Sequence, residues 1–245
     1  TKSIDEKLKS LGKSVGSSFL KGASVAGAAM TGLVGVSIKS YADIEQNIGG
    51  VQTLFKTSAD TVIANAKKAY ETAGLSANQY METVTSFSAS LLQSLGGDTV
   101  KAAQVADMAI IDMSDNANKM GTSMEAIQNA YQGFAKQNYT MLDNLKLGYG
   151  GTKEEMQRLL ADAQKITGIK YDISNLNDVY QAIHVIQGEL GITGTTAKEA
   201  TETISGSVNA VKGAWSNFMS GSGSIDEVIS TVSIAVTNVG SAIAT

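Results

Sequence analysis

The chain has 245 residues, of which 43% are hydrophobic, and its formal net charge is −4. Arg158 is the only arginine among its 19 basic residues, which argues against sequence-specific nucleic-acid binding because such proteins depend on arginine for base and phosphate contacts. The absence of cysteine excludes disulfides, thiol nucleophiles and cysteine-ligated metal sites.

The chain contains no proline, although average usage would place roughly a dozen in this length. Proline removes a backbone donor and costs roughly 3 kcal/mol inside a helix, so its complete absence favours backbone that is helical almost everywhere. We therefore predict an all-α protein: a multi-helix bundle of amphipathic helices, flanked by apolar Gly/Ala-rich helical arms, that assembles as a coiled-coil oligomer.

The first arm covers residues 1–40, in which a lysine-rich stretch precedes an uncharged run over 22–38. This run carries the small-residue pairs Ala23/Gly27 and Ala28/Gly32, which let helices approach closely. At 17 residues it is marginal for a membrane span, so a membrane-inserting helix and a packing helix both remain open.

Residues 41–219 form the predicted body, a series of amphipathic helices with capping signals at their ends. Apolar side chains recur at helical spacing, for example at Tyr80, Val84, Phe87 and Leu91, and again at Leu176, Val179, Ile183, Ile186 and Leu190. Asp98, Thr122, Thr152 and Thr196 are the predicted N-caps, the last of them opening a single long helix that includes residues 204–218. The segment Ile169–Ile173 is the only short run that could be extended.

Residues 220–245 comprise a Ser/Gly linker, Ser220 to Ser224, and the start of a second apolar segment. Since the chain starts with Thr1 and its last apolar run is still open at Thr245, we expect it to be a piece of a longer protein.

The body offers little that points to catalysis, a cofactor or a metal site. His184 is the only histidine and is interpreted as a partly buried or surface residue. Asp107, Asp112 and Asp115 are interpreted as a solvated helix face, because they lack the spacing of a calcium loop. We predict no enzymatic activity, no cofactor and no metal ion.

The glycine-rich loop at Gly148, Gly150 and Gly151 precedes Thr152 and Lys153 and shares the composition of a phosphate-binding loop. It lacks the spacing of that motif, and no strand leads into it. We interpret the three glycines as a candidate hinge between helices.

A heptad-spaced apolar stripe is the candidate oligomer seam. We refer to it below as the 204–218 stripe, and its members are Ile204, Val208, Val211, Trp215 and Phe218. Self-association is predicted from this spacing, because one chain would not fully bury such a stripe.

Four segments, in the same order, resemble the N-terminal region of tail tape measure proteins from tailed bacteriophages and prophages, particularly those of Gram-positive hosts. They are YADIEQNIGGVQTLF at 41–55, AGLSANQYMETVTSFSASLLQSLGG at 73–97, YGGTKEEMQRLL at 149–160 and TGTTAKEATETISGSVNAVKGAW at 193–215. The resemblance covers roughly residues 41–220 and carries no catalytic signature.

This resemblance implies a structural virion protein that occupies the lumen of the tail tube, sets the length of the tube and is ejected to assist DNA passage through the host envelope. It implies a homo-oligomer, with a trimer as the best estimate. The implied partners are the tail tube protein, tail assembly chaperones, tail tip or baseplate proteins and, after ejection, the host membrane. A secreted or membrane-inserting pore-forming protein, or translocator, is the alternative, since it would share two apolar arms around an amphipathic body.

Overall fold

The computed structural model describes residues 39–244, with side chains described for residues 43–242, and it is an all-α multi-helix bundle. No β-strand occurs within these residues, so the predicted all-α multi-helix bundle is confirmed, while the coiled-coil oligomer stays a prediction. Residues 169–173 form no strand. The first arm lies outside the described residues, except for Lys39 and Ser40, which begin α3.

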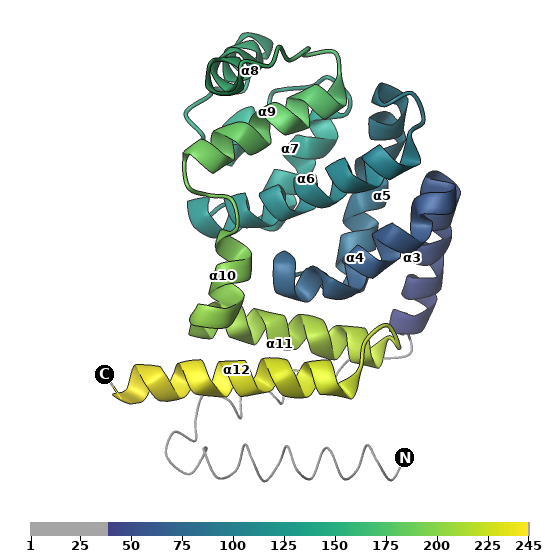
Figure 1. Ribbon diagram of the computed structural model, residues 1–245, viewed down its shortest axis with the longest axis vertical. Coiled ribbons are helices and arrows are strands. Elements are labelled where there is room, and N and C mark those ends of the chain that lie inside the picture. Colours follow the sequence, from purple (N-terminus) through teal and green to yellow (C-terminus); the bar gives the residue numbers. More distant parts are fainter. Residues whose placement is uncertain (1–38, 245) are drawn as a thin grey trace. The chain divides into compact units, whose positions relative to one another are not determined.

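The helices follow one another along the chain with short connections (Figure 1). Their bounds are α3 Lys39–Phe55, η1 Lys56–Ser58, α4 Ala59–Thr72, α5 Ala77–Ser94, α6 Thr99–Met120, α7 Met124–Phe134, η2 Leu142–Leu145, α8 Lys153–Thr167, α9 Leu176–Glu189, α10 Thr195–Glu202, α11 Ile204–Met219 and α12 Ile225–Ala244.

The chain divides into two compact units, and the expected body of residues 41–219 is shared between them. Among the described residues, unit 1 comprises residues 39–46, 67–78 and 197–244. Unit 2 comprises residues 47–66 and 79–196.

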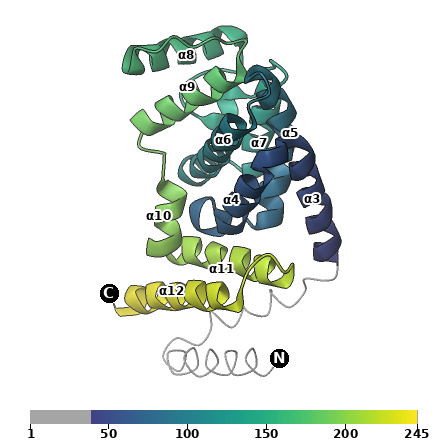
Figure 2. The same ribbon diagram turned by 45° about the vertical axis from the view of Figure 1, so that its right-hand side comes forward.

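Unit 2 is built around α6, which packs against α7, α9 and η1, while α8 and α9 lie side by side (Figure 2). Its core is aromatic: the Tyr180 ring on α9 meets Phe87 on α5 edge-on at 5.6 Å between centroids and lies 5.0 Å from Tyr131 on α7. The apolar side chains predicted for α5 and most of those predicted for α9 are buried here. Leu190 is the exception at 52% exposure, because it lies at the C-cap of α9.

Unit 1 is dominated by the α11–α12 hairpin, whose two helices lie against one another along their length (Figures 1 and 2). Its core also takes Tyr70 from α4 and Ala200 from α10. The buried members contributed by the hairpin are Ala210, Val211, Ala214, Ile225, Val228 and Val232.

The prediction of one long helix beginning at Thr196 is wrong, because the helix is interrupted at Thr203. Thr203 has extended backbone and its hydroxyl accepts a hydrogen bond from the Gly206 N–H, which makes it the N-cap of α11. A helix boundary here also lets α11 approach α10 closely, since a Cβ on Gly206 would lie 2.2 Å from the Glu199 carbonyl oxygen.

Other caps were predicted with mixed success. Asp98 and Thr152 cap α6 and α8 as expected, each accepting from backbone N–H groups of the first turn. The cap of α7 is Ser123, one residue after the predicted Thr122, whose hydroxyl donates to the Asn144 carbonyl instead.

The Ser220–Ser224 segment is a hydrogen-bonded turn between α11 and α12, whereas its composition predicts a flexible linker. The Asn217 carbonyl accepts hydrogen bonds from the N–H groups of Ser222 and Gly223 and from the Ser220 hydroxyl, and Ser220 is buried. The apolar run that follows lies within α12. None of the helices between residues 39 and 244 is both long enough and apolar enough to cross a membrane.

Candidate functional site

The 204–218 stripe lies on α11, and the structure buries only one of its members. Val211 is buried, Ile204 is 37% exposed, and Val208, Trp215 and Phe218 are half-buried. The face of α11 that is buried is instead lined by small and polar side chains, namely Ser207, Ala210, Gly213, Ala214 and Asn217, together with Val211.

This arrangement reverses the usual preference, in which large apolar side chains fill the interior and small or polar ones face water. The small face is used because α11 approaches its neighbours closely and is held by polar contacts. Asn217 accepts a hydrogen bond from the Ala77 N–H at 2.8 Å and donates to the Lys67 carbonyl at 3.3 Å. The large side chains of the stripe are thereby left at the rim of the unit 1 core.

Neighbouring apolar side chains extend this rim. The Trp215 and Phe218 rings lie 5.8 Å apart at an interplanar angle of 47°. Ile229 and Val236 of α12 are likewise half-buried against the same core. Between Ile204 and Ala244 the only charged side chains are Lys212, Asp226 and Glu227, so the hairpin surface is nearly uncharged. Such a surface suits apolar contact with another helix.

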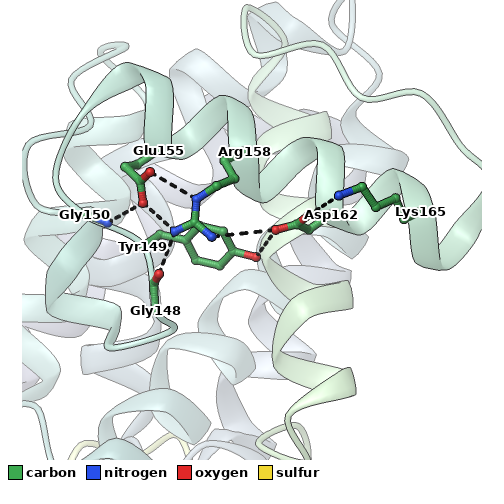
Figure 3. Close-up of polar contacts among 7 residues, drawn as sticks. All are labelled: Gly148, Tyr149, Gly150, Glu155, Arg158, Asp162 and Lys165. Carbon is green, nitrogen blue, oxygen red and sulfur yellow. Dashed lines mark hydrogen bonds and ion pairs between the residues drawn. The ribbon is translucent and has the colours of Figure 1, made fainter.

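The candidate hinge glycines lie in a loop that side chains of α8 hold in place (Figure 3). The Glu155 carboxylate accepts a hydrogen bond from the Gly150 N–H at 3.0 Å, and the Arg158 guanidinium donates to the Gly148 carbonyl at 2.7 Å. Gly148 has a positive φ of 85°, and a Cβ on Gly151 would lie 2.2 Å from the Thr140 carbonyl oxygen. Glycine is therefore required at two of these positions for backbone conformation and packing, while hinge motion stays a prediction.

Arg158 is the centre of this loop's polar contacts. Its guanidinium pairs with Glu155 at 2.5 Å and lies 4.2 Å from the centroid of the Tyr149 ring, and the Tyr149 hydroxyl donates to Asp162 at 3.0 Å. The Arg158 guanidinium, with the Gly150 N–H, lowers the pKa of Glu155 to about 2. An ionised carboxylate therefore occupies the first turn of α8, which disfavours phosphate binding at this loop.

The predicted solvated face of α6 is wrong. Asp112 and Asp115 are 1% and 0% exposed, and Asp107 is half-buried and accepts a hydrogen bond from the Tyr80 hydroxyl at 2.6 Å. The physical reason is that α6 is covered on several sides by other helices, so that acidic residues in its second half lie in the interior. The signal in the sequence was the group of alanines at 102, 103, 106 and 109, all of them buried, which indicates that other helices pack closely against α6.

His184 on α9 is half-buried, as predicted, and it lies against Asp112. Its Nδ1 atom is 2.9 Å and 3.0 Å from the two carboxylate oxygens. Within the described residues there is no cluster of three or more histidine or acidic side chains that could hold a metal ion.

Comparison of the chain with models of known protein families, with characterised proteins and with solved structures yields no match.

Proposed function

We propose that this chain is the N-terminal region of a tail tape measure protein, a structural component of a phage tail or of a related tail-like particle. The proposal rests on the four ordered segments within residues 41–220 that resemble this family. An all-helical, proline-free chain suits the role, because an α-helix converts residue number into length at roughly 1.5 Å per residue. In this role the chain occupies the tube lumen and is ejected into the host envelope.

The single structural observation that supports a structural role best is the reversed packing of α11. Large apolar side chains at heptad spacing remain half-exposed on a nearly uncharged hairpin, while small residues fill the interior. The occupant we propose for this face is a second copy of the chain, since a heptad stripe pairs with a like stripe. A trimer inside the tail tube is the expected assembly, with the tube protein, the assembly chaperones and the tail tip as further partners.

Tail length tests the tape measure proposal directly. In the phage or tail-like particle that contains the chain, 56 residues of proline-free heptad helix are inserted in register directly after Ala244, the last described residue of α12. Tube length measured by electron microscopy should rise by about 84 Å, at 1.5 Å per residue. As a matched control, the same 56 residues inserted between Gly96 and Gly97 lengthen a turn of a folded unit and should leave the tube unchanged.

An unchanged tube length after the first insertion, in particles that still assemble, would refute the role as a ruler. The alternative, a pore-forming protein or translocator, makes a different prediction for the purified chain. It should release dye from liposomes without any tail, whereas a tape measure fragment needs the tail to deliver it. Spontaneous release at low protein concentration would therefore favour the alternative.

A further inference from the structure

Two carboxylates of α6, one helical turn apart, contact segments of unit 2 that lie later in the chain, namely α9 and the start of α10. Asp112 contacts the His184 imidazole of α9 through both of its oxygens. Asp115 accepts hydrogen bonds from the Gly194 N–H at 2.5 Å and from the Thr196 N–H at 2.8 Å, at the start of α10. Together these contacts attach α9, at His184, and the start of α10, at Gly194 and Thr196, to α6, and we call them the α6 clamp.

The two halves of the clamp are compensated differently. Asp115 lies at the N-terminal end of α10 and receives two backbone N–H groups, an arrangement that stabilises a carboxylate charge without any counter-ion. Asp112 receives no backbone donor in the described part of the chain, and His184 is its hydrogen-bond partner. The charge of Asp112 therefore depends on one side chain.

The electrostatic surroundings make that dependence strong. The ionisable groups that face the His184 imidazole are Asp112 and Asp115 of α6, and the buried phenols of Tyr131 and Tyr180 lie beyond them. Burial raises the pKa of both phenols far above neutrality, so they stay uncharged. A protonated His184 is thus the positive charge that balances the Asp112 carboxylate, which is 1% exposed, and an unbalanced buried charge is costly.

The clamp is also incompletely satisfied. The Thr196 hydroxyl oxygen is buried without a hydrogen-bond partner among the described residues, although the N–H of the same residue is bound by Asp115. Such a cluster gains little stability in excess of its desolvation cost, so removal of a single charge has a large effect on it.

We propose that the α6 clamp is a proton-dependent device: with His184 protonated it fastens α9 and the start of α10 to α6, and loss of that proton loosens the connection over residues 190–196. His184 is 37% exposed at its side chain, so it exchanges protons with solvent while Asp112 behind it does not. The state of the clamp therefore follows the pH outside the protein.

The sign of the pH effect is the same for both members of the pair. The hydrogen bond to Asp112 raises the pKa of His184, and burial raises the pKa of Asp112. The folded chain therefore binds more protons than the unfolded chain, and stability falls as pH rises. For His184 the stabilisation is fully present below about pH 6.5, the ordinary value, and is lost as pH rises through the raised folded-state pKa.

The clamp can be tested with one unambiguous probe, because His184 is the only histidine of the chain. In the full chain, the NMR titration of its imidazole should give a pKa above 6.5, and Asp112→Asn should bring that pKa back to about 6.5 or below it. In parallel, amide hydrogen exchange at Gly194 and Thr196, corrected for intrinsic rates, should lose about tenfold protection for each unit by which the pKa is raised, between pH 6 and pH 9.

His184→Gln separates a proton-dependent role from a merely structural one. Glutamine can still donate a hydrogen bond to Asp112 but does not titrate, so this variant should show the same exchange at pH 6 and pH 9. Asp162→Asn on α8 is the control, because it removes a partly exposed carboxylate whose hydrogen-bond partners are Tyr149 and Lys165 and none of the clamp residues, and it should keep the wild-type pH dependence.

Either of two results would overturn the clamp. One is a His184 pKa at or below 6.5 in the folded wild type, which needs no variant to fold. The other is a wild-type protection at Gly194 and Thr196 that does not change between pH 6 and pH 9. Neither result bears on tail length, so the clamp and the tape measure proposal fail independently.

Discussion

Gly213 of α11 lies directly against Tyr70 of α4, so that a Cβ atom placed on Gly213 would come within 2.6 Å of the Tyr70 Cβ. Real Cβ atoms do not approach so closely, and backbone atoms of this region cannot yield as a flexible side chain would. The contact explains why α11 turns its small residues inward: only glycine and alanine let the helix reach the position at which Asn217 bonds to its neighbours.

Gly213→Ala should therefore destabilise the chain by about 1–3 kcal/mol, as expected for an overpacked core. Gly240→Ala is the matched control, because Gly240 is a helical glycine on α12 with no atom within 4 Å of an added Cβ. There, alanine should stabilise by about 0.5–1 kcal/mol through its higher helix propensity. Urea unfolding monitored by Trp215, the only tryptophan of the chain, reports on unit 1 directly. Equal midpoints for the two variants would show that unit 1 relaxes around the new methyl group.

Asn217→Ala should cost about 1–3 kcal/mol, since it leaves the buried N–H of Ala77 without an acceptor. Asn209→Ala, on the exposed side of the same helix, should change the free energy of unfolding by less than about 0.5 kcal/mol. Both are read from chemical unfolding by circular dichroism. If Asn217→Ala lowers the free energy of unfolding no more than Asn209→Ala does, water must replace Asn217 as the acceptor for the Ala77 N–H.

The sequence is informative where structure is decided by near neighbours. Caps such as Asp98 and Thr152, and the buried stripe of α5, follow from spacing and side-chain chemistry within a few residues. The break at Thr203 was missed because the apolar pattern runs across it, and only the close approach of α11 to α10 requires a new helix start.

The candidate sites depended on partners far away in the chain, which periodicity does not indicate. Asp112 is buried and is paired with His184, which lies 72 residues later in the chain. The residues next to Asp112 in the sequence indicate only a solvated helix face. The 204–218 stripe was located correctly as an apolar pattern. The opposite, small-residue face of α11 is the buried one, and this could not be predicted locally. It depends on Tyr70 of α4, which lies against Gly213, and on the hydrogen bond that Asn217 of α11 accepts from Ala77.

Arg158→Lys should loosen the glycine loop without unfolding the protein. Lysine keeps the charge but loses both the forked contact to Glu155 and the stacking on Tyr149. We expect the pKa of Glu155 to rise from about 2 towards its ordinary value, and the Gly150 amide to exchange faster. Because the Arg158 side chain is 48% exposed and its ion pair is screened by solvent, the midpoint of global unfolding should stay close to that of the wild type.

NMR titration of the carboxylates and amide exchange measure the two effects of Arg158→Lys. Lys165→Gln serves as the control, because Lys165 pairs with Asp162 on the same helix but does not contact the loop. An unchanged Glu155 pKa in Arg158→Lys would show that the Gly150 N–H alone sets it.

The oligomer seam gives the last prediction, for which two positions of the 204–218 stripe are useful. Trp215 packs partly on the unit 1 core, so Trp215→Glu tests both the seam and the fold. Ile204 is 37% exposed in the first turn of α11, where a glutamate is favourable for the helix dipole, so Ile204→Glu should leave the protomer stable. Both variants should lower the mass measured by sedimentation equilibrium to that of a single chain.

Val100→Glu is the matched control for these substitutions. Val100 is 61% exposed on α6, outside the stripe, so a glutamate there adds the same charge to an exposed apolar position and should leave the oligomer intact. If the wild type is oligomeric and Ile204→Glu keeps its mass while remaining folded, the stripe is no seam and its large side chains are only the edge of the core. If Val100→Glu alone dissociates the assembly, the contact between copies lies on unit 2.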